Sequence, residues 1–314
     1  MTKDSFVNLH LHTHYSIGDS TIKIPELFYQ VEQYNQSAVA ITDHGSVEGW
    51  TEFFNVARDS NVKPIFGNEF YCKETLDKPV DTNRFHLVIL AKNNNGAKLI
   101  NQLQYIAIQH HHYKPLLPYP KLFELDTDDL FISTACSLGT IGQSLDPTNK
   151  VKKFDEAKIF LNKLLDHFGK DNVALEFQFH PDYLAQKDIN DGLLFLYDNV
   201  DVKYCTVTTD AHFLTNRAIR RYVQADTWNK LLNDVTPTLK SNCLGKSDLI
   251  YKFAEESEFT DTQLVNKMIH NTKVIADQCN VTEVNNIGQG RLLPKFNKHR
   301  QFKKIFLKQP RVKE

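Results

Sequence analysis

Apolar and polar residues alternate in short runs along most of this chain, a pattern that is typical of β-strands. In the first run, residues 6–12, three apolar side chains alternate with Asn8, His10 and His12. Side chains two positions apart on a strand point to the same face, so His10 and His12 are expected side by side. Similar runs predict strands at residues 38–42, 63–71, 86–91, 130–134, 173–177 and 203–208.

Stretches with helical periodicity separate most of these strands. They lie at residues 25–34, 47–59, 96–109, 151–168, 183–197 and 216–232, and two more helices are expected within 247–280. Pro25 suits the first turn of its helix, where the backbone N–H that proline lacks would have no partner in any case. Alternation of strands and helices predicts a parallel sheet.

Seven strand–helix units fit either a barrel or an open, doubly wound sheet. Ligand-type residues follow several of the strands, which is where barrel enzymes place their chemistry, so a seven-unit barrel is favoured. From residue 285 the chain becomes rich in Asn, Gly and Pro, and then basic. We therefore expect a barrel domain at residues 1–284 and a linker-like basic tail at residues 285–314.

Composition is that of a globular protein, and the charge is uneven along the chain. A hydrophobic share of 41% and a charged share of 24% are typical of a soluble protein with a full core. The net charge of -1 gives no global basic excess that would indicate nucleic-acid binding. From Arg291 onward, however, nine Lys/Arg stand against one acidic residue. This tail is either an appendage that contacts phosphate backbones or a solvated end.

Cysteine usage and hydropathy indicate the compartment. The five cysteines are scattered and form no CxxC pair, which argues for a reducing compartment and against a disulfide framework. No apolar run approaches the roughly 20 residues that span a bilayer, and no signal core precedes the first strand. We expect a cytoplasmic protein that does not associate with membranes.

Metal-ligand residues stand near the ends of the predicted strands. Besides His10 and His12, they are Asp19, the sequence Asp43-His44, Glu69, and the sequence Asp210-Ala211-His212. Neutral imidazole is the commonest metal ligand in proteins, and carboxylates can bridge ions that lie a few Å apart. The sequence therefore predicts a metal site at these strand ends.

The motifs around these residues resemble those of the PHP (polymerase and histidinol phosphatase) family, in particular the domain at the N-terminus of bacterial DNA polymerase III alpha subunits. In chain order they are His10-x-His12-Thr-x-x-Ser16, Ala40-Ile-Thr-Asp-His-Gly45, Lys63-Pro-Ile-x-Gly67-x-Glu69, His86-Leu-Val-x-Leu-Ala-Lys-Asn93, Ala135-Cys136-x-x-Gly139 and Thr209-Asp-x-His212. Residues 271–280 and the pair Leu293-Pro294 are similar to the family's connection to the polymerase. The resemblance implies a distorted (β/α)7 TIM-like barrel with a short helical and basic C-terminal extension.

The resemblance also implies two or three divalent metal ions, zinc, manganese or iron, held by nine ligands. At the matching positions this chain has His10, His12, Asp19, His44, Glu69, His86, Cys136, Asp210 and His212. Cys136 and His86 are assigned by resemblance alone, because His86 begins its strand and should lie at the end opposite to the other ligands. The family's usual Asp-Gly is Asp19-Ser20 here, which alters the local turn.

Five further residues are candidates for contacts beside the metals. Asp43 is expected to orient an imidazole. Glu176 and His180 stand at the end of a predicted strand and are candidates for lining the pocket. His14 and Arg217 are candidates for contacting a substrate phosphate, and solvent-facing positions are the alternative for both.

The implied activity is metal-dependent hydrolysis of phosphoesters, with metal-bound hydroxide as the nucleophile and no separate catalytic residue. The polymerase-like motifs favour a DNA 3′ end as substrate, and therefore a 3′→5′ exonuclease of the proofreading type. Two alternatives stay open. One is a small-molecule phosphomonoesterase similar to histidinol phosphatase. The other is a non-catalytic, metal-stabilised scaffold that binds a replicative polymerase or another replication protein.

The polymerase region of the family is not expected in this chain. Too few residues follow Lys295 to form a polymerase palm with its catalytic carboxylates. We therefore expect a stand-alone PHP domain or the N-terminal piece of a split polymerase.

Overall fold

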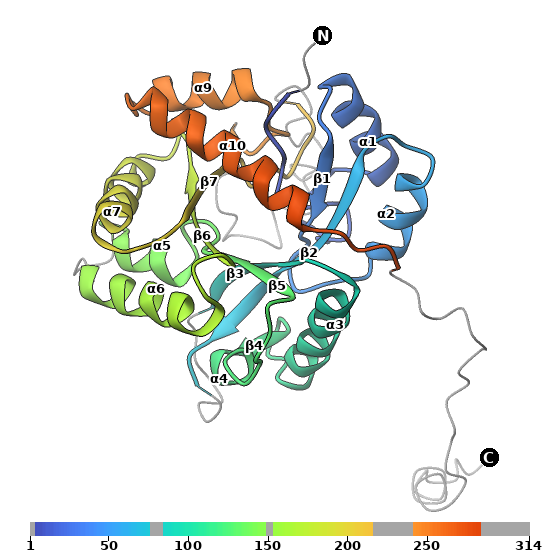
Figure 1. Cartoon of the computed structure of the whole chain (residues 1–314), viewed down its shortest axis with the longest axis horizontal. Coiled ribbons are helices and arrows are strands. Elements are labelled where there is room, and N and C mark those ends of the chain that lie inside the picture. The colour runs from blue at the N-terminus through green and yellow to red at the C-terminus, as the bar shows by residue number, and fades with distance from the viewer. Residues whose placement is uncertain (1–3, 76–83, 149–152, 216–240, 284–314) are drawn as a thin grey trace, which may run out of the picture. The chain divides into compact units, whose positions relative to one another are not determined.

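The computed structural model describes residues 4–75, 84–148, 153–215 and 241–283. Its central element is one mixed sheet of seven strands. The strands follow the order β1-β2-β3-β5-β6-β7, and β4 pairs with β2 outside this path. The sheet is curled, with helices around its outer side (Figure 1). Its strands are β1 Ala38–Ile41, β2 Lys63–Lys73, β3 Phe85–Ala91, β4 Leu116–Pro118, β5 Leu130–Ser133, β6 Val173–Gln178 and β7 Tyr204–Thr208.

Helices form wherever the sequence predicts them within the described residues. They are α1 Ile24–Gln33, α2 Trp50–Ala57, α3 Asn94–Gln109, α4 Tyr119–Leu122, α5 Thr140–Leu145, α6 Phe154–Phe168, α7 Ala185–Asn199, α9 Ser247–Glu256 and α10 Thr262–Gln278. Pro25 lies in the first turn of α1, as predicted. The short helices α4 and α5 and the short strand β4 were not predicted.

The chain divides into two compact units, Met1–Val284 and Asn285–Glu314, and the described residues all belong to the first. The predicted helix at residues 216–232 and the basic tail lie outside the described residues. Among the described helices, none has both the length and the apolar character needed to cross a bilayer.

Strand β3 runs antiparallel to both of its neighbours, β2 and β5, whereas the other described strand pairs are parallel. The prediction of an all-parallel sheet is therefore wrong at this strand. The sequence between the second and third predicted strands has no helical pattern, and an antiparallel pair of strands does not need the crossover helix that a parallel pair needs. As a result, β3 begins where β2 ends: Tyr71 pairs with His86, and Cys72 pairs with Phe85.

Residues 6–12 form an extended segment rather than the predicted strand. Isolated bridges join the segment to the sheet, from Asn8 to Val39 of β1 and from Leu11 to Ala211 beyond β7. Because the segment pairs first with one neighbour and then with another, neither contact grows into a ladder. Hydrogen bonds from its backbone to side chains help to fix its position.

The two halves of the inner sheet face carry different side chains. Ile65 and Val88 belong to an apolar half, which packs against Ile275 of α10. Glu69 stands four positions after Ile65 on β2, and His86 stands two positions before Val88 on β3. Even spacing along a strand keeps side chains on one face, so Glu69 and His86 project from the other, polar half. The same strands therefore supply both an apolar core and a polar site.

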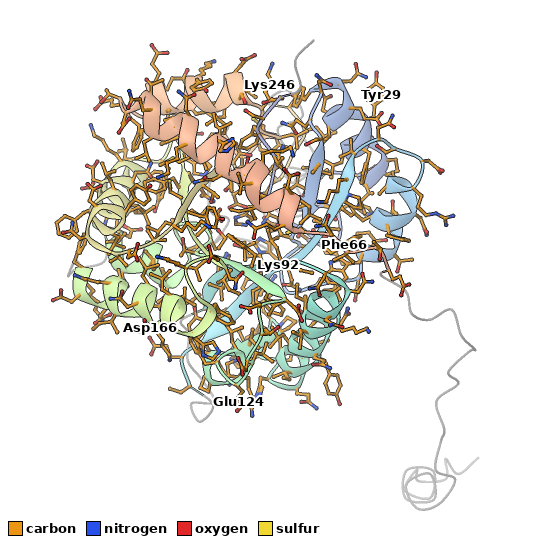
Figure 2. All side chains as sticks on the ribbon, viewed as in Figure 1. Tyr29, Phe66, Lys92, Glu124, Asp166 and Lys246 are labelled. Carbon is orange, nitrogen blue, oxygen red and sulfur yellow. The ribbon has the colours of Figure 1, made fainter. Side chains whose placement is uncertain are left out.

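Helix α10 covers the apolar half of the face and crosses in front of the strands in Figure 1. The Nζ of Lys63, at the start of β2, donates to the carbonyl of Ala276 at 2.8 Å. The carbonyl of Lys92, just beyond β3 and labelled in Figure 2, accepts from the N–H of Asn280 at 2.7 Å. Both contacts lie at the sheet end opposite to the polar half, so α10 closes that end.

Substitution of Asn8 tests which hydrogen bonds hold the extended segment in place. Its Nδ2 donates to Gln36 Oε1 and to the Gly245 carbonyl, each at 3.0 Å, and its Oδ1 accepts from the Gly245 N–H at 2.8 Å. We expect Asn8→Ala to lower the free energy of unfolding by about 2–4 kcal/mol, because buried partners lose their hydrogen bonds. Chemical denaturation measures this change. Asn199→Ala, at an exposed helix end, should cost less than about 1 kcal/mol, and equal losses would contradict the role of Asn8.

Candidate metal centre

Histidines and carboxylates from separate elements meet at the polar half of the sheet. His10 and His12 come from the extended segment, His44 follows β1, and Asp210 and His212 follow β7. Glu69 projects from the middle of β2 into their midst. The parallel bridge between His44 and Glu69 brings the end of β1 against this carboxylate.

The Glu69 carboxylate is fully buried and contacts four imidazoles. Its Oε1 lies 3.1 Å from His10 Nε2 and 3.0 Å from His86 Nδ1. Its Oε2 lies 2.7 Å from His44 Nδ1 and 3.2 Å from His12 Nε2. A carboxylate with contacts on both oxygens is suited to bridging two cations.

Two further carboxylates lie on either side of this group. Asp210 Oδ1 lies 3.0 Å from His12 Nε2. Asp19 Oδ2 lies 2.8 Å from His44 Nε2 and 2.9 Å from His212 Nε2, so the Asp19-Ser20 turn still brings Asp19 to the site. The Asp19 side chain is 40% exposed, whereas that of His12 is fully buried. Asp19 therefore marks the solvent side of the centre.

His86 and Cys136, which sequence reasoning assigned by resemblance alone, also lie in the cluster. His86 reaches it because β3 is antiparallel, which places the first residues of β3 at the same end as the other ligands. Cys136 Sγ, beyond β5, lies 3.6 Å from His86 Nδ1 and 3.8 Å from Glu69 Oε1. Burial, and then the charge of Glu69, raise the pKa of the Cys136 thiol well above its ordinary value. Without a cation beside it, this thiol stays protonated.

Five buried polar atoms in the cluster have no hydrogen-bond partner. They are His10 Nε2, His12 Nε2, His44 Nδ1, Glu69 Oε2 and Asp210 Oδ1. Each lies within 3.3 Å of another atom of this set, yet none has hydrogen-bond geometry. Buried polar atoms without partners are rare in proteins. Nitrogen and oxygen atoms that converge in this way match the coordination of a divalent cation.

Three sets of donor atoms are close enough to share an ion, with the atoms of each set within 4.8 Å of one another. The sets are His10–His12–Glu69–Asp210, His12–His44–His212, and His44–Glu69–His86. Imidazole nitrogens and carboxylate oxygens suit zinc, manganese and iron. The residues present therefore fit divalent cations, and Glu69 belongs to two of the three sets.

Glu176 orients the ring of His10. Its Oε1 lies 2.6 Å from His10 Nδ1, which donates the hydrogen bond and leaves Nε2 free to face the cluster. Glu176 is itself held by Ser133 Oγ at 2.6 Å, Thr208 Oγ1 at 2.6 Å and Gln178 Nε2 at 3.0 Å. A carboxylate that accepts from the far nitrogen of an imidazole is a common support for a metal ligand.

Asp43 acts on His12 through Ser16. Ser16 Oγ donates to Asp43 Oδ1 at 2.7 Å and accepts from His12 Nδ1 at 3.2 Å. The Nδ1 of His212 donates to the backbone carbonyl of Asp210 at 2.7 Å. In both histidines a proton on Nδ1 satisfies this contact and turns Nε2 toward the cluster, where its lone pair faces a cation when the ring is neutral.

Burial and charge work against each other in this centre. Burial opposes ionisation of Glu69, but neighbouring imidazoles, His86 foremost, outweigh it and hold its pKa well below its usual range. Burial likewise opposes protonation of His10, but the carboxylates, Glu176 foremost, raise its pKa well above its usual value. The same balance raises the pKa of His44 to about 10, with Glu69 as the main favourable charge. The carboxylates thus demand positive charge, which protons or metal cations can supply.

Backbone strain occurs at one candidate ligand and directly before another. Asp210 has a φ of 47° and Ala135, directly before Cys136, has a φ of 61°. Side-chain-bearing residues in this left-handed region cost of order 1–3 kcal/mol each, and such strain is concentrated at functional sites. Both residues follow a strand end, where the chain turns sharply to aim a ligand.

The remaining candidates lie beside the cluster or outside the described residues. His14 is 41% exposed and does not join the donor sets. His180 is buried behind them, with Nε2 3.0 Å from Gln178 Oε1 and Nδ1 2.6 Å from Ser241 Oγ. Burial lowers the pKa of His180 to about 4, so its ring is neutral. Arg217 lies outside the described residues.

Sequence reasoning missed the residues that hold the candidate ligands in place. Ser16 stands in the first motif, yet nothing in the sequence assigns it to His12. The contact of Gln178 with Glu176 could have been predicted, because Gln178 stands two residues after Glu176 and shares its strand face. Ser133 and Thr208 come from β5 and β7, and only the pairing of these strands with β6 brings them to Glu176.

A family model described as the PHP domain matches residues 8–180, which is more than half of the chain. The chain belongs to the PHP family. The resemblance inferred from the ordered motifs is therefore confirmed.

Curated relatives of this PHP domain include DNA polymerase III alpha subunits. The protein from Aquifex aeolicus (strain VF5) is 34% identical over 225 residues, covering 68% of this chain and 19% of the relative. The protein from Campylobacter jejuni is 29% identical over 296 residues, covering 88% of this chain and 23% of the relative. The chain thus spans about a fifth of the length of these relatives.

A solved structure from Bifidobacterium adolescentis, described as a candidate metal-dependent phosphoesterase, is a more distant likeness. It has a TM-score of 0.42 and 14% identity, and the match covers 80% of this chain and 96% of that one. Similarity at this level does not indicate a shared function.

We expect Glu176→Gln to weaken binding of zinc or manganese by about 10–100-fold, because His10 loses the carboxylate that fixes its ring. Isothermal titration calorimetry of the metal-stripped protein measures the affinity. Glu52→Gln is a matched control, since Glu52 also lies near a histidine, His14, but outside the cluster. Equal affinities for wild type and Glu176→Gln would contradict this role.

Proposed function

We propose that this PHP domain hydrolyses phosphoesters with the help of bound divalent metal ions. The observation that carries the proposal is the convergence of five buried polar atoms without hydrogen-bond partners in the candidate metal centre. Two or three zinc, manganese or iron ions would be held there by nine residues. These are His10, His12, Asp19, His44, Glu69, His86, Cys136, Asp210 and His212. Family membership supports this assignment.

When bound, the ions supply Lewis-acid chemistry, lowering the pKa of water and neutralising charge on phosphoryl oxygens. The protein contributes orientation and access. The rings of His10 and His12 are fixed by hydrogen bonds at Nδ1, so they hold Nε2 toward the centre without further ordering. The Asp19 side chain lies on the solvent side, and its exposure supports substrate entry beside it.

We further propose that the substrate is a DNA 3′ end and that the activity is a 3′→5′ exonuclease of the proofreading type. The support is that curated relatives are, by name, DNA polymerase subunits. In that role the protein would work in the cytoplasm beside a replicative polymerase or another replication protein. Retention of an acceptable donor atom at all nine ligand positions favours an active enzyme over a non-catalytic scaffold.

Labelled DNA tests this activity directly. With manganese or zinc present, 3′-labelled and 5′-labelled single strands should be shortened stepwise from the 3′ end. EDTA should abolish the reaction. His44→Ala should lower the rate by more than about 100-fold, because loss of a ligand should exceed the loss typical of a supporting residue. Gel analysis of both labels gives rate and polarity together.

His270→Ala is the matched control, because His270 is exposed on α10 at the closed end of the sheet. Its rate should equal that of the wild type. If metal-loaded protein leaves DNA intact but releases phosphate from small monoesters, the substrate is a small molecule similar to histidinol phosphate. If it binds metal and cleaves neither, the scaffold alternative is correct.

A further inference from the structure

A lysine and an arginine lie beside the candidate metal centre, on the side of β2 and β3. Tyr71, two residues after Glu69 on β2, has its ring centroid 5.4 Å from that of His44 and 5.1 Å from that of His86. Lys114 Nζ lies 5.4 Å from the Tyr71 ring centroid. A single aromatic ring therefore separates the Lys114 ammonium from two candidate ligands.

The arginine approaches from the neighbouring strand. Arg84 stands two residues before His86, and its Nη2 donates to the carbonyl of His112 at 3.4 Å. Its guanidinium carbon lies 6.0 Å from the centroid of the Tyr113 ring. Its Nε is buried without a hydrogen-bond partner. We call Tyr71, Arg84, Tyr113 and Lys114 the cationic rim.

Tyr113 is held outward in this rim. Its side chain is 80% exposed, and its φ of 60° lies in the left-handed region, which bulky side chains rarely adopt. An aromatic ring held in solvent by a strained backbone is available to stack on a ligand. Arg84, whose guanidinium carbon lies 6.0 Å from the ring centroid, and the adjacent residue Lys114 place positive charge near this ring.

Both cations lie over aromatic rings rather than beside carboxylates. Among the described residues, neither Arg84 nor Lys114 forms an ion pair, whereas lysines such as Lys121 and Lys153 pair with nearby glutamates. Contact with an aromatic face leaves the N–H donors of a cation available to an anion. These donors lie beside a centre whose own carboxylates would repel a polyanion, so they favour its approach from this side.

We infer that the cationic rim binds the phosphate next to the scissile one in a single-stranded nucleic acid, with a base stacked on Tyr113. This inference rests on the proposed function for its choice of substrate. Stacking of bases on aromatic rings beside a positive groove is how single strands are bound without sequence preference. A small phosphomonoester has no second phosphate that the cationic rim could bind.

Binding of a fluorescein-labelled phosphorothioate oligothymidylate to the zinc-loaded protein, followed by anisotropy, tests the rim with a backbone that resists hydrolysis. Arg84→Gln and Lys114→Gln should each weaken binding about threefold to tenfold. Each should also reduce the slope of log affinity against log salt by about 0.7, as expected for one lost contact to a single strand. Lys203→Gln is the matched control, because Lys203 also lies over a tyrosine, Tyr204, but at the start of β7. It should bind as the wild type does.

Tyr113 has its own comparison. Tyr113→Ala should weaken binding about fivefold or more, and Tyr113→Phe should restore it, because stacking needs the ring and not the hydroxyl. No binding by the wild type, or unchanged binding and salt slope in both cation variants, would overturn the inference. Hydrolysis of p-nitrophenyl phosphate keeps the two proposals apart. If the wild type binds DNA more tightly than the rim variants but hydrolyses no ester, the proposed function alone is refuted. If the wild type and the rim variants hydrolyse the monoester equally and also bind DNA equally, the inference about the rim alone is refuted.

Discussion

The buried charge of Glu69 is the constraint on which the rest of the site depends. A carboxylate removed from water must be matched by positive charge or hydrogen-bond donors, or it destabilises the fold strongly. Here imidazoles from the extended segment, from beyond β1 and from β3 surround it, and they hold its pKa well below its usual range. The elements of the domain converge where they do because each delivers part of that compensation.

The division of the inner sheet face lets one fold carry both a core and a site. The apolar half, closed by α10, supplies packing like that of any protein interior. The polar half keeps atoms without hydrogen-bond partners and a strained Asp210 backbone, features that lower stability when nothing is bound. Binding of cations to the native state alone would recover that stability and would couple metal affinity to folding in this domain.

The outer helices of the domain are ordinary in comparison with this face. Side chains such as Tyr29, labelled in Figure 2, lie on the outer surface of α1 and are 64% exposed. The side chains of the candidate metal centre instead gather at one end of the strands, with most carboxylates and imidazoles buried and Asp19 toward solvent. The cations of the rim stand at its side and meet aromatic rings. This order of charges, negative within and positive beside, suits a centre that attracts cations first and a phosphoester afterwards.

The sequence by itself determined the family, most of the secondary structure and the identity of the residues that meet at the centre. It did so because motifs such as the His10-x-His12 pair and Asp210-Ala211-His212 combine ligand-type residues with strand periodicity, and both signals are local. It misjudged residues 6–12, whose alternating pattern describes an extended chain but not whether a partner runs alongside it. Whether residues 6–12 pair with a neighbouring strand is decided by the tertiary structure.

Strand direction was the other decision left to tertiary structure. The apolar pattern of β3 does not indicate whether the strand runs parallel or antiparallel to its neighbours. His86 was therefore expected at the end opposite to the other candidate ligands, and only the antiparallel pairing with β2 places it beside Glu69. The residues that support the candidate ligands could not be predicted for the same reason. Ser133 and Thr208 reach Glu176 only through the pairing of neighbouring strands, and contacts between residues so far apart in the chain depend on the folded sheet.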